Sequence, residues 1–217
     1  MFSATQWLMN NIDYDVVIVG AGPAGSALAI ELASAGLKIL LADAAKFPRD
    51  KPCGDYVSPK GLKRLRELGC FDQIEALGLT PIKSSRLYLN RDLLVSGDLP
   101  SIDGVPAYGL AIPRKILDNI LFQRAIECGT ETREEFRVKA FHQHGIETVV
   151  EGISKGVTEK ITTRLLVGAD GANSTVAKLC GMQSRDPRYR LASLRAYVHG
   201  LSLPHTLRFF DERFFPG

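Results

Sequence analysis

A strand, a glycine turn, a helix and a second strand follow one another near the start of the chain. Residues 14–19 read YDVVIV, an apolar, β-branched run that is typical of a strand covered on both faces. The chain then passes through GAGPAG into a helix of small apolar residues over 26–35, which ends at Gly36. A second apolar run, LKILLA over 37–42, leads to Asp43. This order predicts a βαβ unit and therefore a parallel sheet in an α/β fold.

The glycine turn has the spacing of a nucleotide-binding loop. It is a G-x-G-x-x-G motif, with its glycines at Gly20, Gly22 and Gly25. In such a motif the first glycine allows a tight turn, the second lets the backbone approach a pyrophosphate, and the third packs helix on strand. Pro23 and Ala24 then begin a helix whose free N–H groups can face that phosphate. Asp43 is placed to accept a hydrogen bond from a ribose hydroxyl, and its charge disfavours a 2′-phosphate there.

Length and composition suit a folded protein without a nucleic-acid partner. The 217 residues are 45% apolar, which is enough for one large domain or two small ones. Lys and Arg number 27 against 24 Asp and Glu, a bias too small to indicate nucleic-acid binding. The four cysteines form no CxxC pair, so we expect no metal site and a reducing, cytoplasmic location. The N-terminal residues lack a signal-peptide pattern, and no run reaches the ~18 apolar residues of a membrane span.

The rest of the chain mixes helical and strand-like patterns. In chain order we expect a helix over 59–69, extended pieces over 82–90, 92–95 and 107–112, a long helix after Pro113, strands within 131–167, a short helix over 175–180, and strands over 193–203 and 205–210. Ser58 and Ser174 stand at the N-cap positions of two of these helices. Turns are expected at His144-Gly145 and Lys155-Gly156.

Four stretches together resemble a known family. They are VVIVGAGPAGSALAIELASAGLKILLAD, KFPRDKPCGDYVSP, IPRKILDNIL and LLVGADGANSTVAKLCG. With them the chain resembles the flavoprotein superfamily built like para-hydroxybenzoate hydroxylase, and most closely its geranylgeranyl reductase branch. The KPCGD stretch is the most specific to this branch. The resemblance implies FAD as the cofactor and NAD(P)H as the reductant.

The resemblance also implies roles for single residues. The ADP half of FAD would be held by Gly20, Gly22, Gly25 and Asp43. Arg114 matches an arginine that opens the long helix and contacts the FAD nucleotide. Asp170 and Gly171 match a motif near both the FAD and the entering nicotinamide. The chain departs from the pattern in having Asp rather than Glu at Asp43, and in having Ala177-Lys178 where an arginine often stands.

The KPCGD loop would face the flavin ring. By resemblance, Arg49, Cys53 and Gly54 lie beside the cofactor, and Cys53 is a candidate proton donor to a substrate carbon. A thiol suits that task if its pKa is tuned toward the working pH, and Arg49 and Lys51 are cations that can lower it. The alternative is a structural role, in which Cys53 is a small residue in a tight Pro-Cys-Gly turn.

The predicted fold class is therefore α/β, with a Rossmann-like three-layer FAD-binding domain and an inserted, incomplete antiparallel-sheet substrate domain. The expected parts are an FAD-binding domain at 14–78 and 106–182, a partial substrate-binding sheet at 79–105 and 183–217, and an N-terminal arm at 1–13. The expected substrate is a small hydrophobic or isoprenoid molecule. The basic helix face formed by Lys60, Lys63, Arg64 and Arg66 is expected to be solvated, with peripheral contact to a membrane or a diphosphate as the alternative.

The leading functional hypothesis is an FAD-dependent oxidoreductase that reduces C=C bonds of an isoprenoid-type substrate with NAD(P)H. The first alternative is a flavin-dependent aromatic monooxygenase or halogenase, because the superfamily supports both chemistries and the fold does not choose between them. The second alternative is a non-catalytic fragment, since a further Gly-Asp flavin motif found downstream in the superfamily does not occur in this sequence.

Overall fold

The computed structural model describes two compact units. The described residues are 12–101, 104–183, 186, 195–197 and 200, together with the backbone of 205–210. The first unit comprises Met1–Lys51 and Lys115–Ala192, and the second comprises Pro52–Arg114 and Ser193–Gly217. Residues 52–78 and 106–114 thus group with the second unit, whereas the sequence assigned them to the FAD-binding domain. The expected arm lies outside the described residues up to position 11, as does most of the expected strand 193–203.

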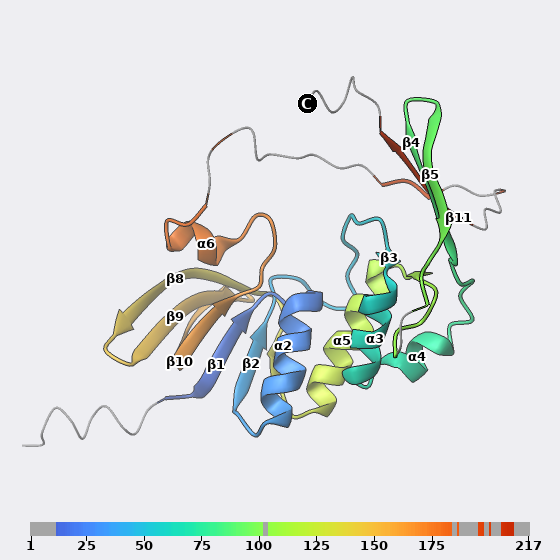
Figure 1. The fold of residues 1–217 in the computed structure, drawn as a ribbon. Coiled ribbons are helices and arrows are strands. Elements are labelled where there is room, and N and C mark those ends of the chain that lie inside the picture. The colour runs from blue at the N-terminus through green and yellow to red at the C-terminus, as the bar shows by residue number, and fades with distance from the viewer. Residues whose placement is uncertain are drawn as a thin grey trace, which may run out of the picture. The chain divides into compact units, whose positions relative to one another are not determined.

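A six-stranded mixed sheet forms the centre of the first unit (Figure 1). Its strands, in spatial order, are β7 (Glu131–Arg133), β2 (Ile39–Ala42), β1 (Tyr14–Val19), β10 (Val157–Gly168), β9 (Glu147–Ser154) and β8 (Phe136–His144). The first four run parallel, whereas β10, β9 and β8 form an antiparallel meander. Gly145 and Gly156, with φ of 62° and 81°, lie in the two meander turns, as the sequence predicted.

Two helices pack against this sheet (Figure 1). Helix α2 (Pro23–Ser34) contacts β1 and β2, and helix α6 (Thr175–Leu179) contacts β8 and β10. Helix α5 (Arg114–Glu127) confirms the long helix that the sequence predicts after Pro113. Leu117, Ile120 and Leu121 of its apolar stripe are buried, whereas Ile116, which the same pattern placed on that stripe, is 38% exposed.

The apolar runs of β1 and β2 lie in the core because both faces of the sheet are covered. Val17, Ile18, Leu40 and Leu41 are all 0% exposed. This explains why the two strands read as continuous hydrophobic runs rather than as alternating ones. The predicted α/β fold is therefore confirmed.

The described part of the second unit contains two helices and two small sheets. Its elements are α3 (Pro59–Glu67), α4 (Phe71–Glu75), β3 (Tyr56–Val57), β4 (Ser84–Leu89), β5 (Asp92–Asp98), β6 (Leu110–Ala111) and β11 (His205–Phe210). The Ser58 hydroxyl accepts a hydrogen bond from Gly61 N at 3.3 Å, which confirms the predicted cap. Strands β4 and β5 are antiparallel, but β11 pairs with β4 in parallel, so this sheet is mixed rather than wholly antiparallel. No helix in the described part of the chain combines the length and apolar character needed to cross a membrane.

Candidate functional site

The first and third glycines of the turn after β1 are packed too closely to carry a side chain. Gly20 has φ of 103°, and a Cβ placed on it would lie 2.4 Å from the Ala169 carbonyl oxygen. A Cβ on Gly25 would lie 1.9 Å from the Gly20 carbonyl oxygen. The first glycine is therefore required by the turn, and the third by the approach of α2 to that turn, for the reasons the motif predicts.

Asp43 ties this turn to the next loop. Its carboxylate accepts hydrogen bonds from Ala21 N through Oδ2 and from Ala45 N through Oδ1, both at 2.8 Å. The side chain is only 12% exposed. A carboxylate has about four lone-pair sites, so Asp43 keeps acceptor capacity for a ribose hydroxyl while it holds the loop. Its contact with a ribose remains a prediction.

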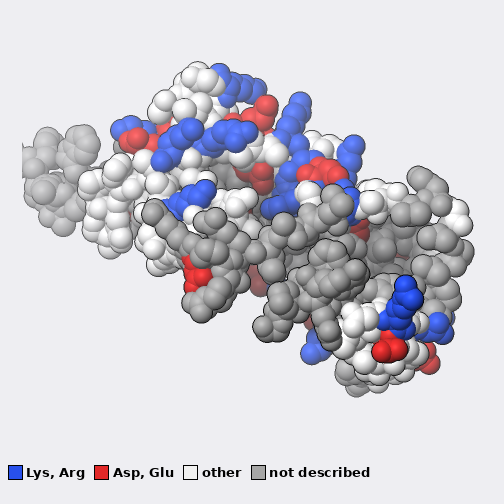
Figure 2. Space-filling view, turned by 90° about the horizontal axis from the view of Figure 1, so that it is seen from above, with Lys and Arg blue, Asp and Glu red and all other residues white. Residues whose placement is uncertain are grey.

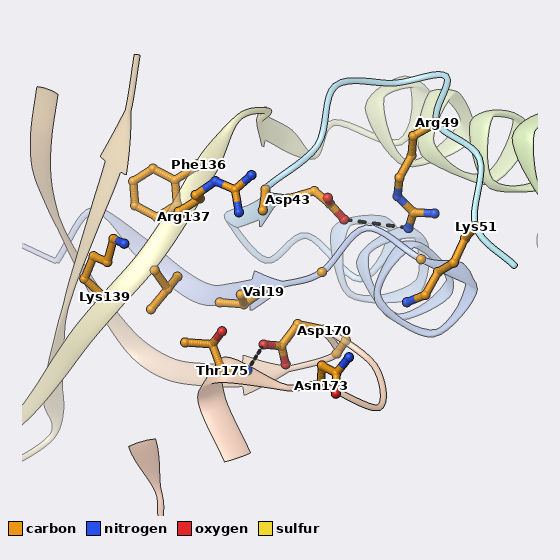
Figure 3. A pocket seen from close by; sticks show the side chains of 15 residues that line it. Val19, Asp43, Arg49, Lys51, Phe136, Arg137, Lys139, Asp170, Asn173 and Thr175 are labelled. Atoms are coloured by element: carbon orange, nitrogen blue, oxygen red, sulfur yellow. Dashed lines mark hydrogen bonds and ion pairs between the residues drawn. The ribbon is translucent and has the colours of Figure 1, made fainter. Parts of the chain in front are cut away.

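A pocket of about 310 Å³ opens at the carboxyl ends of β1 and β2 (Figure 3). Five of the predicted site residues line it: Gly20, Gly22, Asp43, Arg49 and Asp170. The other lining residues are Val19, Ala44, Lys51, Phe136, Arg137, Val138, Lys139, Ala169, Asn173 and Thr175. All belong to the first unit. Parallel sheets bind ligands at this end of their strands.

Positive charge predominates among the side chains of the pocket. Its four cations are Arg49, Lys51, Arg137 and Lys139, and its two carboxylates are Asp43 and Asp170. Figure 2 shows Lys and Arg side chains gathered next to Asp and Glu side chains on the face seen from above. Such a surplus suits the two phosphates of a dinucleotide.

The basic strand residues were missed from the sequence. Arg137 and Lys139 are exposed, whereas their neighbours Phe136 and Val138 are buried. This alternation, visible as FRVK, was the signal that could have identified them. It did not indicate a pocket, because β8 reaches the glycine turn only through the tertiary fold.

Asp170 organises the turn that follows β10. One carboxylate oxygen accepts from the Ser174 hydroxyl at 2.5 Å. The other accepts from Thr175 N at 2.5 Å (Figure 3). Ser174 in turn accepts from Ala177 N at 2.9 Å, which confirms it as the cap of α6. Gly171 has φ of 80°, and a Cβ on it would lie 2.8 Å from Lys51 Nζ. The Asp-Gly pair thus shapes this wall of the pocket, and its contact with a nicotinamide remains a prediction.

Comparison with known proteins agrees with this geometry. The family model described as "FAD binding domain" matches residues 13–210. The chain belongs to this FAD-binding domain family. A menaquinone reductase of Mycobacterium tuberculosis is 36% identical over 192 residues, which are 85% of this chain and 44% of that protein. A geranylgeranyl diphosphate reductase of Rhodobacter capsulatus is 32% identical over 200 residues, 91% of this chain and 46% of that protein.

A solved structure shows the same fold. The anhydrotetracycline hydroxylase OxyS from Streptomyces rimosus is 32% identical with a TM-score of 0.68, covering 77% of this chain and 34% of that one. The chain therefore spans less than half the length of these relatives. Family membership confirms FAD as the cofactor class and confirms the predicted flavoprotein family.

The pocket of this FAD-binding domain fits the nucleotide end of the cofactor. At Gly20 and Gly25 a Cβ would clash with the protein, so only glycine leaves the backbone of this turn in its present position beside the pocket. The cations of the pocket would offset the charge of the phosphates. Arg49 is held in place by Asp118, whose Oδ2 accepts from Arg49 Nη1 at 2.8 Å. Arg49 also lies 3.8 Å from Asp43 Oδ2 and over the ring of Phe47 at 5.0 Å. Asp118 is 0% exposed, a burial that the amphipathic pattern of α5 did not reveal.

The other residues that the sequence predicted to contact FAD lie in two places. Pro23 and Ala24 begin α2, directly after the turn. Cys53, Gly54 and Arg114 belong to the second unit, where Cys53 is exposed and a Cβ on Gly54 would meet nothing within 4 Å. Their roles toward FAD remain predictions.

Proposed function

We propose that this chain provides the FAD-binding part and the reactive loop of a reductase that reduces C=C bonds of an isoprenoid-type substrate with NAD(P)H. The observation that carries the proposal is an exposed Cys53 in a KPCGD loop, on a chain with the glycine cradle of an FAD-binding domain. Similarity to a menaquinone reductase and a geranylgeranyl diphosphate reductase supports it. The proposed partners are NAD(P)H and a small hydrophobic substrate, with a cytoplasmic location and peripheral membrane contact.

The residues of the first unit would bind and orient the cofactor. The backbone at Gly20 and Gly22 would receive the pyrophosphate, and Asp43 would accept from the ribose. Arg49 and Lys51 would offset phosphate charge from the same rim of the pocket. Bound FAD would supply the hydride chemistry that no side chain offers.

Cys53 would supply the proton that reduction of a C=C bond requires. Its thiol is exposed, as a donor to a substrate must be. The structural alternative for Cys53, a small residue in a tight turn, predicts that replacement changes stability rather than turnover. The division of the chain into an FAD-binding domain and a partial substrate sheet is part of the same proposal.

The test is anaerobic turnover with FAD, NADPH and a menaquinone or geranylgeranyl diphosphate. We expect Cys53→Ser to lower substrate reduction by about 10²-fold or more while NADPH still reduces the flavin. Cys180→Ser is the matched control, because Cys180 is also exposed but lies in the other unit. Equal loss in both variants, or none in either, would contradict the role of Cys53.

The hydroxylase neighbour favours a second candidate, a flavin-dependent monooxygenase. Oxygen uptake coupled to a hydroxylated product, with no reduced olefin, would establish it instead. The third candidate is a non-catalytic piece, which binds FAD poorly and turns over neither substrate. The chain covers 44% of the menaquinone reductase, so turnover by these 217 residues alone would exclude this candidate.

A further inference from the structure

A buried carboxylate stands directly after the Cys53-Gly54 pair. Asp55 is 7% exposed and has φ of 59°. Aspartate tolerates this left-handed conformation better than most side chains, but it still needs support from its surroundings. Burial of a charge also needs compensation. Asp55 therefore needs hydrogen-bond and ion-pair partners for both reasons.

Those partners come from two other stretches of the second unit. The carboxylate of Asp55 accepts from the Tyr197 hydroxyl at 2.7 Å through Oδ2. Through Oδ1 it accepts from Arg114 N at 3.3 Å and from Arg195 Nη1 at 3.4 Å. Its backbone carbonyl accepts from Ile112 N at 2.8 Å. One residue thus joins the KPCGD loop to residues 112–114 and to residues 195–197.

The two side-chain partners also support each other. The Arg195 guanidinium lies over the Tyr197 ring at 4.7 Å from its centroid. The Arg195 side chain is 17% exposed, so its charge faces Asp55 with little solvent screening. Asp55 itself forms and breaks no bond to the substrate in the proposed chemistry.

We propose that Asp55 is a positioning residue that fixes the Cys53-Gly54 turn by holding it to residues 112–114 and 195–197. The inference rests on the proposed function only in that the proposed function makes Cys53 the proton donor. Without the carboxylate, the loop would lose three of its contacts, and Cys53 would sample many orientations.

The test is the mobility of a nitroxide label on Cys53, read by electron paramagnetic resonance. Cys128 and Cys180 are replaced by serine in all samples, and Cys70 is 0% exposed and stays unlabelled. Asp55→Gly keeps the left-handed backbone without strain, so it isolates the loss of the carboxylate. For this variant we expect a spectrum with narrow lines, which is typical of a mobile label. Asp55→Asn keeps the shape and part of the hydrogen bonding, and we expect it to restore most of the immobile spectrum.

Amide hydrogen exchange at Ile112 gives a second readout. Its acceptor is the backbone carbonyl of residue 55, which every variant retains. Faster exchange therefore reports movement of the loop rather than deletion of the acceptor. Because one hydrogen bond contributes modestly, we expect about fivefold faster exchange in Tyr197→Phe and a larger effect in Asp55→Gly.

Asp50→Gly is the matched control, because it makes the same change at an exposed position of the same loop. The inference is overturned if Asp55→Gly leaves the label immobile, or if Asp50→Gly mobilises it equally. Neither measurement uses turnover. A failure of the proposed reductase activity would therefore leave this result unaffected, and the reverse also holds.

Discussion

The Tyr14 hydroxyl donates a hydrogen bond to Glu131 Oε2 at 2.7 Å. The two residues begin β1 and β7, which lie on either side of β2 in the sheet. Tyr14 is 8% exposed. Burial, together with the bond to the Glu131 carboxylate and its negative charge, raises the pKa of Tyr14 above its ordinary value.

This shift predicts a loss of stability in alkali. The folded protein holds the Tyr14 proton more tightly than the unfolded chain, so its contribution is complete below the ordinary tyrosine pKa of about 10 and is lost as the pH rises beyond it. We expect the free energy of unfolding, measured in urea from about pH 8 to about pH 11, to fall less steeply in Tyr14→Phe. Glu131→Gln should give an intermediate slope. Identical slopes in all three proteins would contradict the assignment.

Asp118, the buried partner of Arg49, should be required for the stability of the first unit. Asp118 is 0% exposed, and its ion pair with Arg49 is 2.8 Å long. Asp118→Asn removes the shorter of the two ion pairs of Arg49 and leaves only the 3.8 Å pair with Asp43, so we expect the free energy of unfolding to fall by about 3 kcal/mol. FAD binding, followed by flavin fluorescence, should weaken in the same variant because Arg49 would lose its orientation.

Glu127→Gln is the control for this variant. Glu127 also pairs with an arginine of α5, Arg124, at 3.1 Å, but its side chain is 50% exposed. Because exposed pairs contribute little, we expect a change below about 1 kcal/mol. Equal destabilisation by the two substitutions would show that burial is not the source of the effect.

The third glycine of the motif should not tolerate a methyl group. A Cβ on Gly25 would lie 1.9 Å from the Gly20 carbonyl oxygen, so α2 or the turn would have to move. We expect Gly25→Ala to lower the free energy of unfolding by about 1–3 kcal/mol and to abolish retention of FAD on a desalting column. At Gly97 a Cβ would meet nothing within 4 Å, and Gly97→Ala should leave both properties close to wild type. Normal FAD retention by Gly25→Ala would disprove the packing argument.

Salt should weaken FAD binding through the cations of the pocket. We expect the Kd for FAD to rise between about 0.05 M and about 0.5 M NaCl, because counterions screen the phosphate contacts. A double variant, Arg137→Gln with Lys139→Gln, should bind more weakly at low salt and respond less to added salt. Lys115→Gln, an exposed lysine outside the pocket lining, should keep the wild-type response. A double variant that keeps the full salt response would exclude a role for these cations.

Local sequence patterns predicted the elements of the fold well. The caps at Ser58 and Ser174 and the turns at Gly145 and Gly156 were predictable, because each depends on a few neighbouring residues. The parallel pairing of β11 with β4 was not predictable, because no local sequence pattern specifies the direction in which two distant strands pair. Which strands pair in a sheet, and in which direction, depends on the tertiary fold.

The residues of the candidate site were likewise predictable only where they depend on a local pattern. The glycine turn and Asp43 were found because the motif has a fixed spacing along the chain. Arg137, Lys139 and Asp118 were missed because they reach the site from β8 and α5. Asp118 was hidden further, since an acidic residue on an amphipathic helix normally faces solvent.

The close approach of Gly20 to Ala169 also determines when the cofactor site can form during synthesis. Strand β1 emerges from the ribosome before both of its neighbours, β2 and β10, and its last pairing with β10 is Val19 with Gly168. A nascent chain that stops short of β10 can fold α2 but cannot complete the wall beside the glycine turn. Until then one edge of β1, with Val17 and Ile18, stays unpaired and open to aggregation. Formation of the cofactor site therefore depends on long-range closure of the chain, which is the slow kind of folding step.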